Sequence, residues 1–166
     1  MQRYLFIALF TVFSVLPILG QTPSLKRDDF GPLVGGPWMG TLTYRDYSSN
    51  KEVSIPSNLK VTRPTEQNRA WIFEYEYPKE PKANSKEKVV ISENGTSIDE
   101  GKVVERERLA SGALRLVTEQ RGKDNDENAV IRHIYLISES SFSITKEVRS
   151  ESSTKFFERN RYSWRR

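Results

Sequence analysis

The sequence contains no cysteine among its 166 residues. Disulfide bonds, thiolate metal sites and a cysteine nucleophile are therefore excluded. A bacterial lipoprotein anchor is excluded as well, because it requires a cysteine at the start of the mature chain. Exported domains of this size often use disulfides, so an exported chain of this composition must rely on its hydrophobic core for stability.

Histidine is almost as scarce, since His133 is the only one. A serine triad needs a histidine beside a nucleophilic serine, and no Gly-x-Ser-x-Gly motif is present. A histidine-based metal site would need a second histidine, and no dinucleotide or phosphate-loop glycine motif occurs. We therefore expect no cofactor, no metal and no catalysis, and we interpret His133 as an ordinary half-buried strand residue.

Long apolar runs are limited to the N-terminus. A positive start at Met1-Gln2-Arg3 precedes an apolar stretch over residues 4–20, and Pro17 and Gly20 resemble the break and the small residue that signal peptidase needs. We predict a cleaved signal peptide over residues 1–20 and a secreted or periplasmic protein without a transmembrane span after cleavage. An uncleaved anchor is the alternative, but the stretch is near the short limit of about 17–18 residues for a span.

Acidic residues are few at the C-terminal end. The net charge is +4. The last segment contains five basic residues and a single acidic one, Glu158; the basic residues are Lys155, Arg159, Arg161, Arg165 and Arg166. Such a basic patch can attract phosphates or anionic lipids, but Lys and Arg on a strand edge also prevent aggregation between sheets. We favour the second interpretation and expect no nucleic-acid partner, because export removes most of them.

Helical periodicity is absent, whereas strand periodicity recurs along the chain. Residues 21–37 are rich in Pro and Gly and predict an irregular N-terminal arm. Residues 38–166 form the single predicted domain, in which apolar and polar residues alternate with turn residues between runs. The predicted strands are 38–47, 53–61, 70–77, 87–92, 102–109, 113–120, 130–137, 142–149 and 156–164. Within the second of these, Pro56 lacks a ladder donor and indicates an edge or a bulge.

Short links between these strands favour an all-β fold with neighbouring strands paired in sequence order. We predict an antiparallel up-and-down meander of about 8–10 strands closed into a barrel. The alternative is an open sandwich or half-barrel.

Alternation also places charged side chains on apolar strand faces. Glu105 and Glu107 share a face with Val103 and Leu109, and Lys146 shares one with Phe142. These three charged residues either line a polar cavity or reach solvent through a twist or bulge, because buried charge is costly.

An aromatic set falls on the apolar faces of several predicted strands. It could line a ligand cavity or fill a solid core. With the charged residues above, the cavity candidates are Trp38, Tyr44, Trp71, Phe73, Tyr75, Tyr77, Glu105, Glu107, Phe142 and Lys146.

The segment Gly36-Pro37-Trp38, just before the first strand, resembles the Gly-x-Trp motif of the calycin superfamily, which includes lipocalins and fatty-acid-binding-like barrels. The resemblance implies a calycin-like barrel that holds a small hydrophobic ligand. It also implies that Trp38 closes the barrel floor and packs against an arginine near the last strand, here Arg159 or Arg161. We expect Trp164, two residues from the C-terminus, to contribute far less to stability than Trp38.

These observations predict an exported, non-enzymatic protein that binds a small apolar ligand inside a β-barrel. The alternative is a structural or interaction protein with a filled barrel, whose partner is another component of the cell envelope. An esterase or isomerase that uses Glu105 and Glu107 is a third, more distant hypothesis.

Overall fold

The computed structural model describes residues 22–46, 49, 51–65 and 69–166. The predicted signal peptide, residues 1–20, lies outside the described residues. In the described part of the chain, one antiparallel sheet of ten strands follows a 3-10 helix, η1 (Arg27–Leu33). The strands are β1 (Gly35–Arg45), β2 (Glu52–Thr62), β3 (Ala70–Glu76), β4 (Ser85–Val90), β5 (Ser97–Ile98), β6 (Gly101–Arg108), β7 (Leu114–Asp124), β8 (Glu127–Ile137), β9 (Ser141–Ser150) and β10 (Phe157–Arg165). A second 3-10 helix, η2 (Pro81–Ala83), precedes β4.

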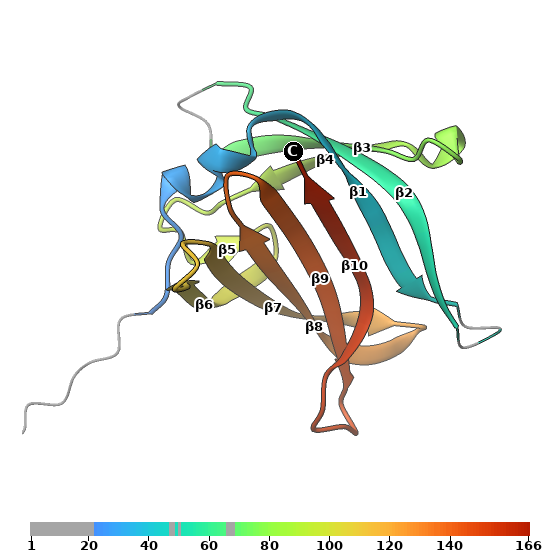
Figure 1. Cartoon of the computed structure of the whole chain (residues 1–166). Helices are drawn as coiled ribbons and strands as arrows, with labels where there is room; N and C mark the ends of the chain where they lie inside the picture. The colour runs from blue at the N-terminus through green and yellow to red at the C-terminus, as the bar shows by residue number, and fades with distance from the viewer. Residues whose placement is uncertain (1–21, 47–48, 50, 66–68) are drawn as a thin grey trace, which may run out of the picture.

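The sheet is a meander that curls into a nearly closed barrel (Figure 1). Its strand order is β4-β3-β2-β1-β10-β9-β8-β7-β6-β5, so the first strand pairs with the last. The predicted all-β fold class is therefore confirmed. Strand β5 was missed because it has only two residues, too few to show alternation.

The barrel meets itself at a narrow seam between β4 and β5. An isolated bridge joins Ile91 to Ile98, and the Asp99 backbone N–H donates to the Val90 carbonyl at 2.7 Å. The Val90 N–H in turn donates to Asp99 Oδ1 at 2.8 Å. The Asp99 carboxylate thus replaces a backbone acceptor at the seam, where β4 and β5 are too short to form a longer ladder.

The predicted position of Pro56 at a strand edge is consistent with the pairing of β2. Pro56 faces Thr41 on β1, whereas β3 pairs with β2 only from Asn58 onward. Pro56 therefore costs no hydrogen bond between β2 and β3 among the described residues.

Three consecutive rows of inward-facing side chains run across β7, β8, β9 and β10 from the plugged end of the barrel, as the strand registers show. We call them the floor row (Leu114, Ile137, Phe142, Trp164), the middle row (Leu116, Tyr135, Ile144, Tyr162) and the upper row (Thr118, His133, Lys146, Asn160). Polarity rises from the floor row to the upper row. The alternation of each strand therefore produces an apolar floor and a polar upper row, and beyond the upper row Ile131 and Val148 are again buried and apolar.

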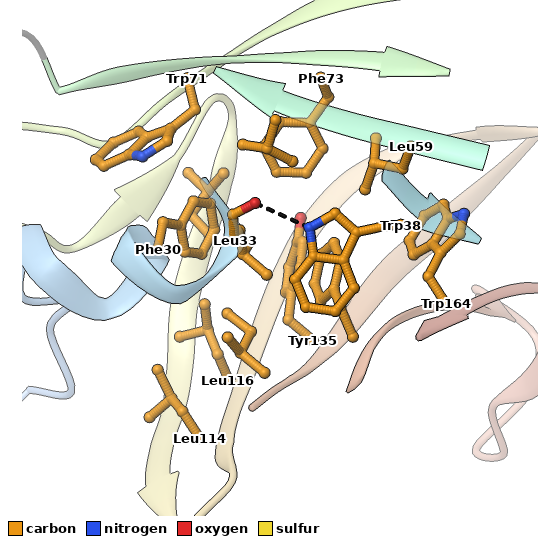
Figure 2. Close-up of a cluster of buried hydrophobic side chains, with 14 of the residues drawn as sticks. Phe30, Leu33, Trp38, Leu59, Trp71, Phe73, Leu114, Leu116, Tyr135 and Trp164 are labelled. Carbon is orange, nitrogen blue, oxygen red and sulfur yellow. Dashed lines mark hydrogen bonds between the residues drawn. The ribbon is translucent and has the colours of Figure 1, made fainter. Parts of the chain in front are cut away.

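Helix η1 closes the apolar end as a plug. Phe30 and Leu33 are fully buried, and the Phe30 ring packs edge-on against Trp71 with 5.4 Å between the ring centroids (Figure 2). Asp29, also buried, accepts two hydrogen bonds from the Arg106 guanidinium of β6, at 2.8 and 2.7 Å. Part of the predicted irregular arm is thus an ordered element of the core.

Trp38 lies beside this plug. It is fully buried, and its indole Nε1 donates to the Leu33 carbonyl at 3.0 Å (Figure 2). The Arg166 guanidinium lies over the ring, 4.3 Å from the ring centroid. The implied arginine partner therefore exists at the floor, but its identity differs from the prediction.

The prediction that Arg159 or Arg161 packs against Trp38 is wrong. Arg159 pairs with Asp124 at 3.0 Å, and Arg161 pairs with Glu158 at 3.3 Å. Antiparallel pairing places Thr43, far from Trp38 along β1, beside Arg161, whereas Met39 faces Arg165. The end of β10, not its start, therefore reaches the barrel floor.

Trp164 also differs from the expectation. It is 1% exposed and stacks on Tyr162 and Phe142, with centroid distances of 5.0 and 5.3 Å. A residue near the C-terminus is part of the core because its strand is paired on both sides.

Among the described residues, no helix has the length and apolar character needed to cross a membrane.

Candidate functional site

A cavity of about 480 Å³ occupies the polar half of the barrel interior. Its near wall carries the upper row and three residues of the middle row, Tyr135, Ile144 and Tyr162. Its far wall comes from β3 and β4, and its edge from the seam beside β5. The apolar floor below is filled, so the hollow is confined to one end of the barrel.

The upper row supplies the basic groups of the cavity. His133 and Lys146 are direct neighbours across β8 and β9, and Asn160 follows on β10. Within the described residues, the side chains of these three make no hydrogen bond or ion pair with the protein. Burial, together with the positive charge of Lys146, lowers the pKa of His133. Near neutral pH the row therefore offers one ammonium, one neutral imidazole and one amide.

The opposite side of the cavity is acidic. Glu87 on β4 faces Phe73 on β3, and Asp99 stands at the seam, where the backbone has a positive φ of 48°. Partial burial and the charge of Asp99 raise the pKa of Glu87, and burial raises the pKa of Asp99 as well. Both carboxyl groups are reachable by solvent. Acidic acceptors therefore stand across the cavity from basic donors.

Aromatic rings form the surface between these charged sides. Tyr75 and Tyr162 lie with ring centroids 5.4 Å apart, and the Tyr162 hydroxyl shares a 2.7 Å hydrogen bond with the Tyr77 hydroxyl. Burial raises the pKa values of Tyr75, Tyr135 and Tyr162, so all three remain neutral phenols. Their faces offer flat apolar contact area with a hydroxyl at the edge.

The structure brings only some of the predicted cavity residues together. Phe73, Tyr75 and Lys146 line the cavity. Trp38, Trp71 and Phe142 are buried in the floor, and Tyr77 is buried beside Tyr162. Tyr44 lies away from the cavity, in a shallow depression with Arg45 and Glu52.

Glu105 and Glu107 point outward, which corrects the inward interpretation of these two carboxylates. The register of β6 against β7 shifts between Val103 and Glu105, so a bulge moves the following side chains to the other face. Glu105 then forms an ion pair with Arg115, and Arg106 turns inward to Asp29. The hypothesis of an enzyme using this pair loses its geometric basis.

Several lining residues were missed by the sequence reasoning. His133 shares a face with Ile131 and Tyr135, and Glu87 shares one with Val89 and Ile91, so alternation alone could have placed both inside. Asp99 gave no signal, because it belongs to a turn.

The arrangement offers paired donors and acceptors around an aromatic surface. Within the described part of the chain, no group of three or more His, Cys, Asp or Glu residues is placed to hold a metal ion. The groups that line the cavity can contact a ligand through hydrogen bonds, charge and aromatic rings.

The fold and the site together define a class: a meander barrel that is plugged and solid at one end and hollow and polar at the other. In comparisons with known proteins, no family model matches the chain and no curated protein matches it either.

Proposed function

We propose that this is a non-enzymatic binding protein that holds a small ligand with an apolar body in the hollow end of its barrel. The cavity of about 480 Å³ carries the proposal, because known ligand sites occupy about 300–1,000 Å³ and combine apolar walls with a few polar groups. This cavity has both kinds of lining.

The division of the barrel supports binding over the filled-barrel alternative. Residues at the plugged end such as Phe30, Trp38 and Phe142 are almost fully buried and supply a core without help from a ligand. The polar half adds little to that core, and the side chains of Lys146 and His133 have no hydrogen-bond or ion-pair partner among the described residues. Side chains that cost stability without forming contacts are typical of binding sites.

The calycin-like assignment belongs to the same proposal. Trp38 lies near the start of β1, covers the floor and contacts Arg166, which directly follows β10, as the resemblance at Gly36-Pro37-Trp38 implies. We propose that the protein acts outside the cytoplasm, on the strength of the apolar stretch over residues 4–20.

A cavity-filling variant tests the proposal. Ile144 lines the cavity, whereas its neighbour Thr145 faces the outside of the barrel. We expect the fluorescent dye 1-anilinonaphthalene-8-sulfonate to bind saturably to the wild type and to Thr145→Trp. Ile144→Trp should bind it about tenfold more weakly or not at all, because the indole fills the space that the ligand needs.

Urea unfolding of both variants controls for damage to the fold. The proposal fails if neither this dye, nor a fatty acid, nor haem binds saturably to the wild type. It also fails if Ile144→Trp binds as tightly as Thr145→Trp. Either result would favour the interaction protein with a filled barrel.

A further inference from the structure

Opposite charges stand on opposite sides of the cavity without contacting each other. Lys146 belongs to the upper row on β9 and is flanked by His133 and Asn160. Glu87 and Asp99 belong to β4 and the seam. Among the described residues, Lys146 and Glu87 have no ion-pair partner. Glu100 lines the cavity beside Asp99, so the cavity separates a cation from three carboxylates.

Ligand binding would remove water from both sides. A ligand with a single charge would pair with one side and leave the other charge dehydrated and unpaired, which is costly. A neutral ligand would leave both sides in that condition. A ligand with both charges satisfies both sides at once, and each charge-assisted hydrogen bond is stronger than a neutral one.

The lining also fits the body of such a ligand. Phe73, Tyr75 and Tyr162 present rings between the acidic and basic sides. Aromatic faces attract ammonium groups and accept apolar groups equally well. Neutral donors such as Asn160 can add hydrogen bonds to a carboxylate beside Lys146.

We propose that the ligand is a small zwitterion, with an ammonium group directed to Glu87 and Asp99 and a carboxylate directed to Lys146 and Asn160. This inference rests on the proposed function and narrows it from any small ligand to an amine that also carries an acid. Its apolar part lies on the rings of β3 and β10.

Two matched sets of probes separate charge from shape. The first set shares a phenyl ring: phenylalanine, 2-phenylethylamine and 3-phenylpropionate. The second shares an alkyl chain with charges at its ends: 8-aminooctanoate, octylamine and octanoate. We expect at least one of the two zwitterions to bind about tenfold more tightly than both singly charged partners in titration calorimetry.

Variants of the basic and the acidic side of the cavity test which side binds each charge of the ligand. Lys146→Met should abolish the advantage of that zwitterion over the matched amine, and Glu87→Gln should reduce its advantage over the matched acid. Lys102→Met and Glu107→Gln make the same changes on exposed residues of β6 and should leave both ratios unchanged. Circular dichroism and urea unfolding establish that each variant folds.

The outcomes distinguish this inference from the proposed function. If the dye binds in the cavity but neither zwitterion exceeds its singly charged partners, the zwitterion inference is wrong and the binding function stands. If a zwitterion binds best but the Lys146 and Glu87 variants retain its full advantage, the assigned residues are wrong. If no probe binds at all and the dye does not bind, both proposals fail.

Discussion

Trp38 is held on two sides at the floor of the barrel. Leu33 accepts its indole hydrogen bond, and Arg166 covers the ring while donating to the Pro32 and Glu139 carbonyls at 2.8 Å each. One guanidinium thus connects the arm, the first strand and the loop before β9. Truncation of Trp38 removes the surface on which these contacts meet.

We predict that Trp38→Ala and Trp164→Ala will destabilise the protein by similar amounts, about 3–5 kcal/mol each, because both rings are almost fully buried. Urea unfolding measures the effect. Met39→Ala is the control, since Met39 is 64% exposed on the same strand. A Trp164→Ala midpoint close to that of Met39→Ala would contradict the prediction and restore the original expectation for Trp164.

The arginine partner shows what sequence can specify at this scale. The Gly-Pro-Trp segment predicts that a strand begins near Trp38, and its resemblance to the calycin motif implies an arginine partner near the last strand. The partner's identity depends on the register of β1 against β10, which pairs Met39 with Arg165. No local pattern encodes a register between strands so far apart, so Arg159 and Arg161 could not be distinguished from Arg166.

At the scale of elements, alternation predicted nearly all the strands but not their irregularities. Lys146 faces inward as its alternation indicates, because β9 pairs with β8 without a shift. Glu105 and Glu107 face outward, because one extra residue in β6 exchanges the faces. The upper row itself is a product of registers across four strands. Alternation therefore predicts which side chains face inward on each strand, but it does not predict which of them become neighbours across strands.

The upper row also predicts a pH dependence. The folded pKa of His133 is lowered from 6.5 by burial and by Lys146, so the folded state binds this proton less tightly than the unfolded state does. Its contribution to stability is therefore present above pH 6.5 and is lost as the pH falls toward the folded pKa. A substitution of His133 leaves the other titratable groups of the cavity unchanged, namely Lys146 beside His133 and Glu87, Asp99 and Glu100 across the cavity.

We predict that His133→Gln will unfold at a higher urea concentration than the wild type at about pH 5, relative to the same comparison at about pH 8. The same comparison, with and without His133→Gln in a Lys146→Met background, should show a smaller change between about pH 5 and about pH 8, because the charge of Lys146 is one of the causes of the lowered His133 pKa. An identical difference at both pH values would show that burial of His133 does not perturb its titration.

The whole molecule depends on how the N-terminal arm enters the barrel. The side chain of Asp29 is 4% exposed and pairs with Arg106, which is 20% exposed, and Asp29 also raises the pKa of that guanidinium. The backbone N–H of Leu25 donates to the Gly95 carbonyl at 2.8 Å, where a side chain at position 95 would overlap Leu25. Two separate contacts therefore hold the arm against the sheet.

We predict that Asp29→Ala will cost about 3–5 kcal/mol, because it leaves a largely buried guanidinium without its partner. Asp28→Ala removes an exposed neighbouring carboxylate and should change stability by less than about 0.5 kcal/mol. Urea unfolding compares the two. A double variant that also replaces Arg106 with Met should recover part of the loss, and the absence of any recovery would contradict an ion-pair origin.

The pairing of β1 with β10 has a consequence for the kinetics of folding. Arg166 contacts the Pro32 carbonyl across 134 positions of sequence, so the contacts that join β1 to β10 in the middle of the sheet are among the most distant in the chain. Such long-range pairing requires a large loop entropy to be overcome before its contacts form, and folding rates fall accordingly. Until β10 arrives, β1 presents an open edge to other chains. The order in which the strands assemble therefore sets how long this protein is exposed to aggregation.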